Sequence, residues 1–194
     1  MPNQEEDIVV GFDLDGVIID HTQNKMRIAA RYGVTLRPEE THAEVMKESF
    51  TPETYREIKS QLYDATDDAL AAPLMEGAFA ALAKLHEHGI PYFLVSLQKN
   101  PMHALHLLEV RGLWGEYFTP ENTFFVEHME DKNSVAQSLG VTHFIDDERA
   151  VLNLMHSVPH RILFDARELF AANPNFVPVK SWSELGYLLG IATS

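Results

Sequence analysis

The stretch from Ile8 to Gly16 has the sequence Ile-Val-Val-Gly-Phe-Asp-Leu-Asp-Gly, and it decides how the chain folds. Its first five residues form a short apolar run that is rich in β-branched side chains. Runs of this length and composition are typical of strands that are buried on both faces of a parallel sheet. The run ends at two closely spaced carboxylates, Asp13 and Asp15. We therefore expect a buried strand that delivers acidic side chains at its carboxyl end.

The same pattern, an apolar run closed by a polar residue, recurs along the chain. Residues 92–95 precede Ser96, and residues 143–145 precede Asp146 and Asp147. Further strand-like runs and the amphipathic helix patterns between them complete the alternation: residues 123–126 and 161–164 for strands, and residues 78–88, 102–110 and 133–139 for helices. Strands that alternate with helices predict an α/β fold with a Rossmann-like, parallel-sheet core of three layers.

The segment from residue 20 to residue 72 departs from this alternation because it contains no convincing strand. Three amphipathic helices are expected there instead: residues 21–32, 38–50 and 52–70. Pro38 and Pro52 lie near the starts of the second and third helices, where a missing N–H costs nothing. The sequence therefore predicts an α/β core of residues 1–19 and 73–194, interrupted after its first strand by a small α-helical cap of residues 20–72.

Composition limits the classes of function. The 194 residues include 15 Lys and Arg against 29 Asp and Glu, which gives a formal net charge of −14. This balance argues against a partner such as a nucleic-acid polymer or an anionic membrane surface, because both need clustered positive charge. The chain has no cysteine, which excludes disulfides and thiolate metal sites and fits a reducing compartment. The acidic N-terminus has no signal-peptide pattern and the apolar runs are strand-sized, so we expect a cytoplasmic protein that does not cross a membrane.

The polar residues at the strand ends are expected to converge. In an open parallel sheet, ligands bind beyond the carboxyl ends of the strands, where the strand order reverses. Asp13, Asp15, Ser96, Asp146 and Asp147 all follow such ends. Four carboxylates close together would be costly without a cation. Oxygen ligands of this kind suit Mg²⁺, so the pattern predicts a magnesium site.

The segment from Phe12 to Ile18 resembles the first motif of the haloacid dehalogenase-like (HAD) superfamily, an apolar strand followed by the pattern D-x-D-G-x-x. Three other features match the remaining motifs in the same chain order: Ser96 closing a second strand, Lys132 opening a helix, and Asp146-Asp147 closing a further strand. Residues 179–185 resemble the strand-to-final-helix closure common in the superfamily. The resemblance covers the whole predicted α/β core.

The resemblance implies a phosphoryl-transfer site, and the chemistry of the residues suits each role. Asp13 can bind Mg²⁺ with one oxygen and attack phosphorus with the other, which forms an aspartyl-phosphate. Asp15 can protonate the leaving alcohol and then deprotonate the attacking water, and the resemblance makes its backbone carbonyl a metal ligand. Ser96 and the N–H of Leu97 can bind phosphoryl oxygens at a helix start. Lys132 supplies positive charge beside the carboxylates and the phosphate.

Within the acidic pair, the match to the superfamily pattern makes Asp147 the expected direct metal ligand. Asp146 would then hold a metal-bound water or orient Lys132. Taken singly, each site residue has a simpler explanation: Asp15 as part of a turn, Ser96 as a helix N-cap, and Lys132 as a solvated surface charge. Their joint occurrence in chain order favours a catalytic site.

Ten histidines also raise the possibility of a transition-metal site, above all His103 with His106 and His156 with His160. No carboxylate lies at a ligand-like spacing near either pair. We therefore interpret these histidines as surface or packing residues.

Because Asp15 is present, the sequence is similar to the phosphatases of the superfamily rather than to its hydrolytic dehalogenases. We expect a Mg²⁺-dependent phosphatase that hydrolyses a small phosphorylated substrate, a sugar phosphate or a nucleotide, beneath the helical cap. One alternative is a phosphomutase or a phosphonate hydrolase with the same chemistry. Lys25 and Lys47 are candidates, by location alone, for the cap lysine that phosphonate cleavage would need. Another alternative is a low-turnover Mg²⁺-binding interaction module. The sequence leaves the identity of the substrate and the oligomeric state open.

Overall fold

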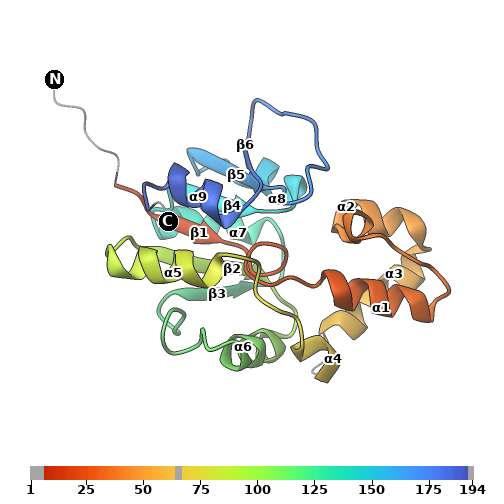
Figure 1. Ribbon diagram of the computed structural model, residues 1–194. Helices are drawn as coiled ribbons and strands as arrows, with labels where there is room; N and C mark the ends of the chain where they lie inside the picture. Colours follow the sequence, from red (N-terminus) through yellow and green to blue (C-terminus); the bar gives the residue numbers. More distant parts are fainter. Residues whose placement is uncertain (1–6, 64–66, 192–194) are drawn as a thin grey trace.

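A six-stranded parallel sheet forms the centre of the computed structural model, which describes residues 7–63 and 67–191 (Figure 1). The strand order is β3-β2-β1-β4-β5-β6. The strands are β1 (Val10–Phe12), β2 (Tyr92–Leu97), β3 (Thr123–Val126), β4 (His143–Asp146), β5 (His160–Phe164) and β6 (Val177–Val179). The α/β class and the Rossmann-like parallel sheet, predicted from the alternation of strands and helices, are confirmed.

The first strand, β1, lies between β2 and β4. Phe12 pairs in register with Leu94 of β2 and with Ile145 of β4. The chain moves outward from β1 to β3 on one side of the sheet and from β4 to β6 on the other, so the strand order reverses beside β1. The carboxyl ends of β1 and β4 therefore flank the position where open α/β sheets bind ligands.

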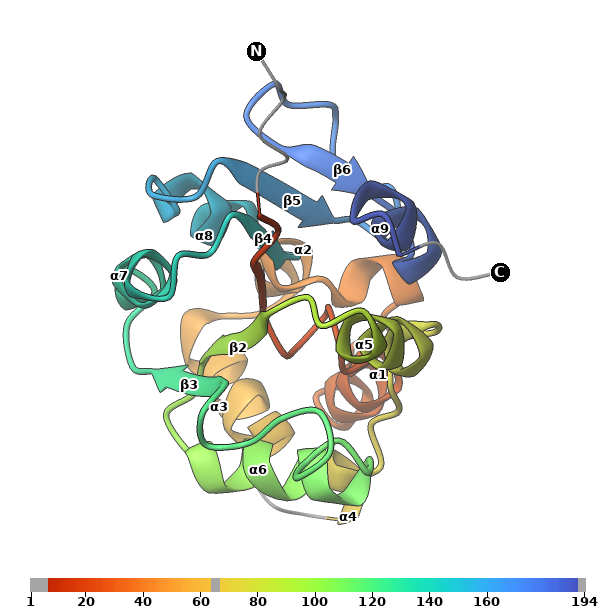
Figure 2. The same ribbon diagram turned by 90° about the vertical axis from the view of Figure 1, so that its left-hand side faces the viewer.

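Helices cover both faces of the sheet. Successive side chains of a strand point to opposite faces, so neighbours on β2 belong to different hydrophobic clusters. Leu94 lies in the cluster formed with α5 (Ala78–Glu87), α6 (Pro101–Val110) and α9 (Trp182–Leu188). Val95 lies in the cluster formed with α7 (Asp131–Ser138) and α8 (Arg149–Leu154). Figure 2 shows α5 and α9 on one side of the sheet and α7 and α8 on the other, which gives the expected three layers.

The chain between β1 and α5 forms a helical insertion beyond the carboxyl ends of the strands (Figure 1). Its elements are α1 (Thr22–Arg31), η1 (Pro38–Thr41), α2 (Ala43–Met46), η2 (Lys47–Ser49), α3 (Pro52–Tyr63) and α4 (Asp67–Leu70). Buried side chains such as Ile28, Met46 and Ile58 give the insertion a hydrophobic cluster of its own. Its two connections to the sheet are paired, because Ile19 forms an antiparallel bridge with Leu74.

The insertion differs from the prediction mainly in its second helix. The expected helix of residues 38–50 is broken into the short α2 between two 3-10 turns. His42 causes the break because its backbone is extended, with φ −61° and ψ 139°, and its ring caps α2 by accepting a hydrogen bond from the N–H of Glu44. The third expected range contains α3 and α4, and residues 64–66 lie outside the described residues. In the described part of the chain, no helix is long and apolar enough to cross a membrane.

Candidate active site

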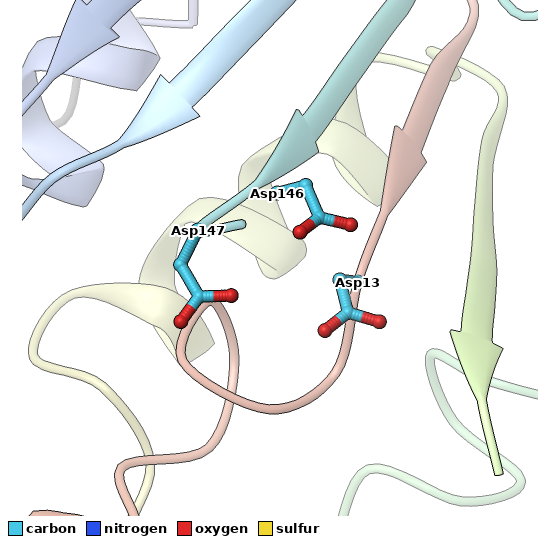
Figure 3. A group of neighbouring side chains, drawn as sticks. All are labelled: Asp13, Asp146 and Asp147. Atoms are coloured by element: carbon cyan, nitrogen blue, oxygen red, sulfur yellow. The ribbon is translucent and has the colours of Figure 1, made fainter. Parts of the chain in front are cut away.

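Three carboxylates meet at the carboxyl ends of β1 and β4 (Figure 3). Asp13 directly follows β1, Asp146 is the last residue of β4, and Asp147 comes next. One oxygen from each carboxylate lies within 4.8 Å of the other two. Asp13 and Asp146 are 8 % and 1 % exposed, and the side chain of Asp147 is 14 % exposed. The structure thus brings together the acidic residues that the strand ends were expected to deliver.

Lys132 reaches this acidic group from the first turn of α7. Its Nζ donates hydrogen bonds to Oδ1 of Asp13 at 2.7 Å and to Oδ2 of Asp146 at 2.8 Å. The lysine is only 2 % exposed. Burial lowers the pKa of Lys132, but the charges and hydrogen bonds of the two carboxylates outweigh burial and hold this pKa above its usual range. Lys132 is therefore an ammonium fixed between two carboxylates, and not a solvated surface lysine.

One lysine does not neutralise the acidic group. Burial raises the pKa of Asp146 to about 7 although Lys132 opposes the rise, and the charge of Asp13 adds to it. Burial, followed by the charges of Asp146 and Asp13, holds the pKa of Asp147 well above its usual range. These shifts show that negative charge at this position is destabilised. A hard divalent cation fits the site, because the donor set is three carboxylate oxygens and the cation would supply the missing positive charge.

The two members of the acidic pair differ in how many oxygens remain available. Asp146 uses both carboxylate oxygens, since Oδ2 accepts from Lys132 and Oδ1 accepts from the backbone N–H of Glu148 at 2.8 Å. The carboxylate of Asp147 lies 3.6 Å from the ring of His42, which is longer than an ordinary hydrogen bond. Asp147 therefore has more free lone pairs for a cation than Asp146.

The loop after β1 packs Gly16 directly against the acidic pair. Gly16 has a φ of +82°, and a Cβ at this position would lie 2.2 Å from Oδ2 of Asp147. Its N–H donates to the carbonyl of Ile19 at 2.9 Å, which closes a tight turn. Only glycine combines this backbone conformation with so close an approach. The glycine of the D-x-D-G pattern is therefore part of the geometry of the site.

The carboxylate of Asp15 has different partners from the three-carboxylate group. Nε2 of His21 contacts Oδ1 at 2.8 Å, and Nε2 of Gln98 donates to Oδ2 at 2.9 Å. Burial raises the pKa of Asp15, but the charge and hydrogen bond of His21, with help from Lys25 and Gln98, bring the net pKa below its usual value. This direction favours the ionised form of the Asp15 carboxylate. The metal-binding role that the resemblance implies falls on the backbone carbonyl of Asp15 and does not compete with these side-chain contacts.

The surroundings of Ser96 and Leu97 correct one expectation. These residues were expected at a helix start, but β2 continues through both of them, and α6 begins only at Pro101. The reason is that proline suits the first position of a helix, so the helix starts there with Asn100 before it. Ser96 is 1 % exposed and its Oγ lies 3.4 Å from Nε2 of Gln98, whereas Leu97 is 38 % exposed at the end of β2. Any phosphate contact from this segment therefore comes from a strand end.

The helical insertion contacts the loop that carries Asp147. Nδ1 of His42 accepts from the N–H of Glu44, so its Nε2 is the donor to the carbonyl of Asp147 at 3.1 Å. The carboxylate of Glu44 accepts from Nη2 of Arg149 at 2.5 Å and from the backbone N–H of Arg149 at 3.1 Å. Phe170 packs against both sides of this contact, with its ring centroid 4.9 Å from the His42 ring and 3.9 Å from the Arg149 guanidinium. The insertion is thus held against the core next to the acidic pair.

Four polar residues of this region were not predicted from the sequence: His21, His42, Glu44 and Gln98. Gln98 lies two positions beyond Ser96, but no periodic pattern distinguishes it from a loop residue. The three residues of the insertion lie in segments where amphipathic helices were expected, and nothing in that pattern indicates which polar side chain turns toward the core. Of the two candidate lysines of the insertion, Lys47 is exposed, whereas the charge of Lys25 opposes the rise that burial causes in the pKa of Asp147. Lys25 therefore acts on the site, and Lys47 lies at the surface.

No protein-family model and no curated protein matches the chain, but solved structures do. A HAD family hydrolase from Deinococcus radiodurans, solved with bound phosphate and sodium, is 23% identical with a TM-score of 0.57, and the match covers 95% of this chain and 97% of that one. A HAD hydrolase of family IA, variant 3, from Entamoeba histolytica is 15% identical, with a TM-score of 0.59 and coverage of 91% and 94%. A protein named as a β-phosphoglucomutase of Thermotoga maritima is 17% identical, with a TM-score of 0.58 and coverage of 94% and 98%.

The fold and the geometry together define an α/β protein whose acidic site contains a buried lysine and lies where the strand order reverses. More particularly, the fold is that of the HAD hydrolases, over nearly the full length of the structures compared. The resemblance to this superfamily, predicted from four short motifs, is confirmed at the level of the fold.

Proposed function

We propose that the chain is a Mg²⁺-dependent phosphatase that hydrolyses a small phosphomonoester through an aspartyl-phosphate on Asp13. The observation that carries the proposal is the bridge from Lys132 to Asp13 and Asp146, with Asp147 beside them, at the strand-order reversal. A buried ammonium that holds one oxygen of Asp13 fixes the orientation of this carboxylate and leaves Oδ2 free for attack. Phosphoryl transfer depends chiefly on such positioning and on charge stabilisation.

The proposed reaction has two half-reactions, and the residues of the chain account for each proton. Because the structure favours the ionised form of Asp15, this carboxylate must first take up a proton from solvent. Oδ2 of Asp13 then attacks phosphorus, the bond from phosphorus to the ester oxygen breaks, and Asp15 gives its proton to the leaving alcohol. Water then attacks the aspartyl-phosphate, Asp15 takes the proton of this water, and the bond from phosphorus to Asp13 breaks. The products are alcohol and inorganic phosphate, Asp13 is a free carboxylate again, and Asp15 again carries a proton.

The cation and the phosphate would be held by separate groups. Asp13, Asp147 and the backbone carbonyl of Asp15 would hold Mg²⁺, which when bound offsets the negative charge of the phosphoryl group. The free oxygens of Asp147 support its role as the direct ligand, and the engagement of both Asp146 oxygens supports a role in orienting Lys132. Lys132, the hydroxyl of Ser96 and the N–H of Leu97 would bind the phosphoryl oxygens. The phosphate in the D. radiodurans hydrolase of the same fold is consistent with such a site.

The helical insertion is proposed to act as the cap of the site. We divide the chain into an α/β core of residues 1–19 and 73–194 and a cap of residues 20–72, and three observations support this division. The insertion has its own hydrophobic cluster, its two connections lie side by side, and it contacts the core beside Asp147 through His42 and Glu44. A cap in this position would exclude water and contact the leaving group.

A second candidate, a phosphomutase, is favoured by the likeness to proteins named as β-phosphoglucomutases. The two functions differ in what accepts the phosphoryl group from Asp13, which is water in a phosphatase and a substrate hydroxyl in a mutase. Incubation with a sugar phosphate and measurement of both inorganic phosphate and isomerised sugar phosphate separates them.

The proposal is tested by Asp13→Asn, which keeps the volume of the side chain and removes the nucleophile. Asp7→Asn is the matched control, because Asp7 is an exposed residue that precedes the same strand at its opposite end. Hydrolysis of an aryl phosphate should disappear in the first variant and persist in the second, with both folded by circular dichroism. Activity of Asp13→Asn above about a tenth of the wild-type rate would contradict the assignment, since loss of a nucleophile costs several orders of magnitude.

A further inference from the structure

The carboxylate of Asp15 is held at both oxygens, from two different parts of the molecule. His21 lies immediately before α1, at the entrance to the helical insertion, and contacts Oδ1 at 2.8 Å. Gln98 follows β2 in the core and donates to Oδ2 at 2.9 Å. We propose that His21 and Gln98 are positioning residues that set the orientation of Asp15 for proton transfer. This inference rests on the proposed function, because it assumes that Asp15 is the acid and base.

The environment of His21 indicates that its polar ring serves the hydrogen bond with Asp15. The residue is 3 % exposed, and among the described residues its Nδ1 has no hydrogen-bond partner. Burying a polar atom without a partner is unfavourable, so an apolar side chain would serve better if packing were the only requirement. The ring is held in place by Tyr63 of α3, which meets it edge-on with ring centroids 6.1 Å apart. The contact that uses the polarity of His21 is therefore the one with Asp15.

Gln98 anchors the other oxygen of Asp15 to the sheet. Its side chain is buried, and its backbone N–H donates to the carbonyl of Val126 at 3.0 Å, which continues the pairing of β2 with β3. Its Nε2 also lies 3.4 Å from Oγ of Ser96, which is proposed to bind phosphate. The amide thus links the position of Asp15 to the position of the phosphoryl group.

Two donors at opposite oxygens fix the plane of the Asp15 carboxylate and still allow proton transfer. A carboxylate oxygen has two lone pairs, so each oxygen that accepts one hydrogen bond keeps a second site for the proton of the leaving group or of the water. Loss of one donor would let the carboxylate rotate. A displacement of about 1 Å in a reacting group lowers rates by as much as about 100-fold. The effect is confined to steps in which Asp15 moves a proton.

The experiment compares His21→Ala and Gln98→Ala in the wild-type and Asp15→Asn backgrounds, with saturating Mg²⁺. Substrates are an alkyl phosphate and an aryl phosphate, because only the alkoxide leaving group strongly needs a proton. The exposed His156→Ala serves as the control for removing an imidazole, since His156 lies in the loop before β5 at the opposite edge of the sheet. His21→Gln keeps a donor at this position and tests for rescue, and it replaces His21→Ala if that variant does not fold.

In the wild-type background we expect each alanine variant to lower kcat for the alkyl phosphate by roughly 10- to 100-fold, with a smaller loss for the aryl phosphate. KM should stay within about threefold for His21→Ala, because His21 contacts Asp15 and not the proposed phosphate-binding residues. A larger change in KM for Gln98→Ala would report its contact with Ser96. In the Asp15→Asn background the same substitutions should change kcat by less than about twofold, since residues that act through one group are not additive. His21→Gln should recover part of the loss.

The outcomes separate this inference from the proposed function. If Asp15→Asn shows the leaving-group dependence of an acid and base but His21→Ala and Gln98→Ala cause the same loss in both backgrounds, the positioning role is wrong and the proposed function stands. Equal losses on both esters would also overturn the positioning role. If Asp15→Asn itself slows both esters equally and no aspartyl-phosphate accumulates, the acid and base assignment fails, and the inference fails with it.

Discussion

Replacement of Lys132 by methionine tests the charge balance of the site. Methionine has a similar length and no charge, so the variant Lys132→Met leaves Asp13 and Asp146 without the ammonium that lies between them. The lysine is 2 % exposed and donates to the two carboxylates at 2.7 and 2.8 Å. Water cannot replace its charge at such a buried position. The variant should therefore be much less stable in the absence of a divalent cation.

The magnitude follows from the burial of the ion pairs. Removing one partner of a buried ion pair costs about 3–5 kcal/mol. For a domain of this size each kcal/mol shifts Tm by about 2–4 °C, so Tm should fall by about 6–20 °C. The loss should depend on pH, because burial already raises the pKa of Asp146 to about 7 and Lys132 opposes this rise. Without Lys132, the pKa of Asp146 in the folded state lies even further above its value in the unfolded state. The variant is therefore more stable at low pH and loses this stability as the pH rises.

The assay is urea unfolding in EDTA at about pH 5 and about pH 8. A carboxyl group whose pKa is raised in the folded state destabilises the protein less at the lower pH than at the higher pH. Lys84→Met is the matched control, because the Lys84–Glu87 pair is 43% and 61% exposed and such pairs contribute only about 0–1 kcal/mol. Mg²⁺ should restore part of the lost stability, since a ligand of the folded state stabilises it. A loss below about 1 kcal/mol at pH 8, or an equal loss at both pH values, would refute the reasoning.

Three further predictions concern the cation, the acidic pair and the insertion. Activity on an aryl phosphate should vanish in EDTA and return with Mg²⁺ but poorly with Ca²⁺, whose longer bonds misplace Asp13; full activity in chelator would contradict this. In EDTA, Asp147→Asn should raise Tm, because burial and the charges of Asp146 and Asp13 raise the pKa of Asp147 and make its charged form unfavourable. The gain should be larger at high pH than at low pH, and a lower Tm would contradict this. Glu44→Gln weakens the contact with Arg149, so it should raise KM and speed amide hydrogen exchange in the insertion. The control is Glu53→Gln, which alters an exposed ion pair within α3, and unchanged exchange in Glu44→Gln would contradict this prediction.

The core of the fold could be predicted because its signals are local and repeated. Strands β1 to β5 are short apolar runs, and α5, α6 and α7 each end within a few residues of a glycine, so these predicted ranges agree with the structure within a few residues. The short α8 and β6 carry no such signal and were not predicted as elements. The helix expected at residues 38–50 failed because one residue, His42, interrupts it through a contact with the core. Such a tertiary contact leaves no trace in the apolar periodicity of the segment.

The acidic half of the site could be predicted for a topological reason. Parallel strands place their carboxyl ends at one edge, so Asp13, Asp146 and Asp147 were expected at the same edge of the sheet, and the pairing of β1 with β4 makes them neighbours. Lys132 was expected from the chain order of the motifs, and the structure places it between two of these carboxylates. His21 could not be predicted, because its partner depends on how the insertion folds back onto the core.

The charge of the site explains why the insertion contributes more than a cover. Among the described core residues, the carboxylates of Asp13 and Asp146 contact the ammonium of Lys132, and the carboxylates of Asp15 and Asp147 lie in the same site. A phosphate dianion would add further negative charge. A bound divalent cation would offset only part of this excess, so positive charge from outside the core would stabilise the charged site further. The charge of Lys25 in the insertion acts in this direction, because it opposes the rise that burial causes in the pKa of Asp147. An insertion that only excluded water would raise these pKa values further by removing solvent. Under the proposed function, Lys25 would help the covered site to accept an anion.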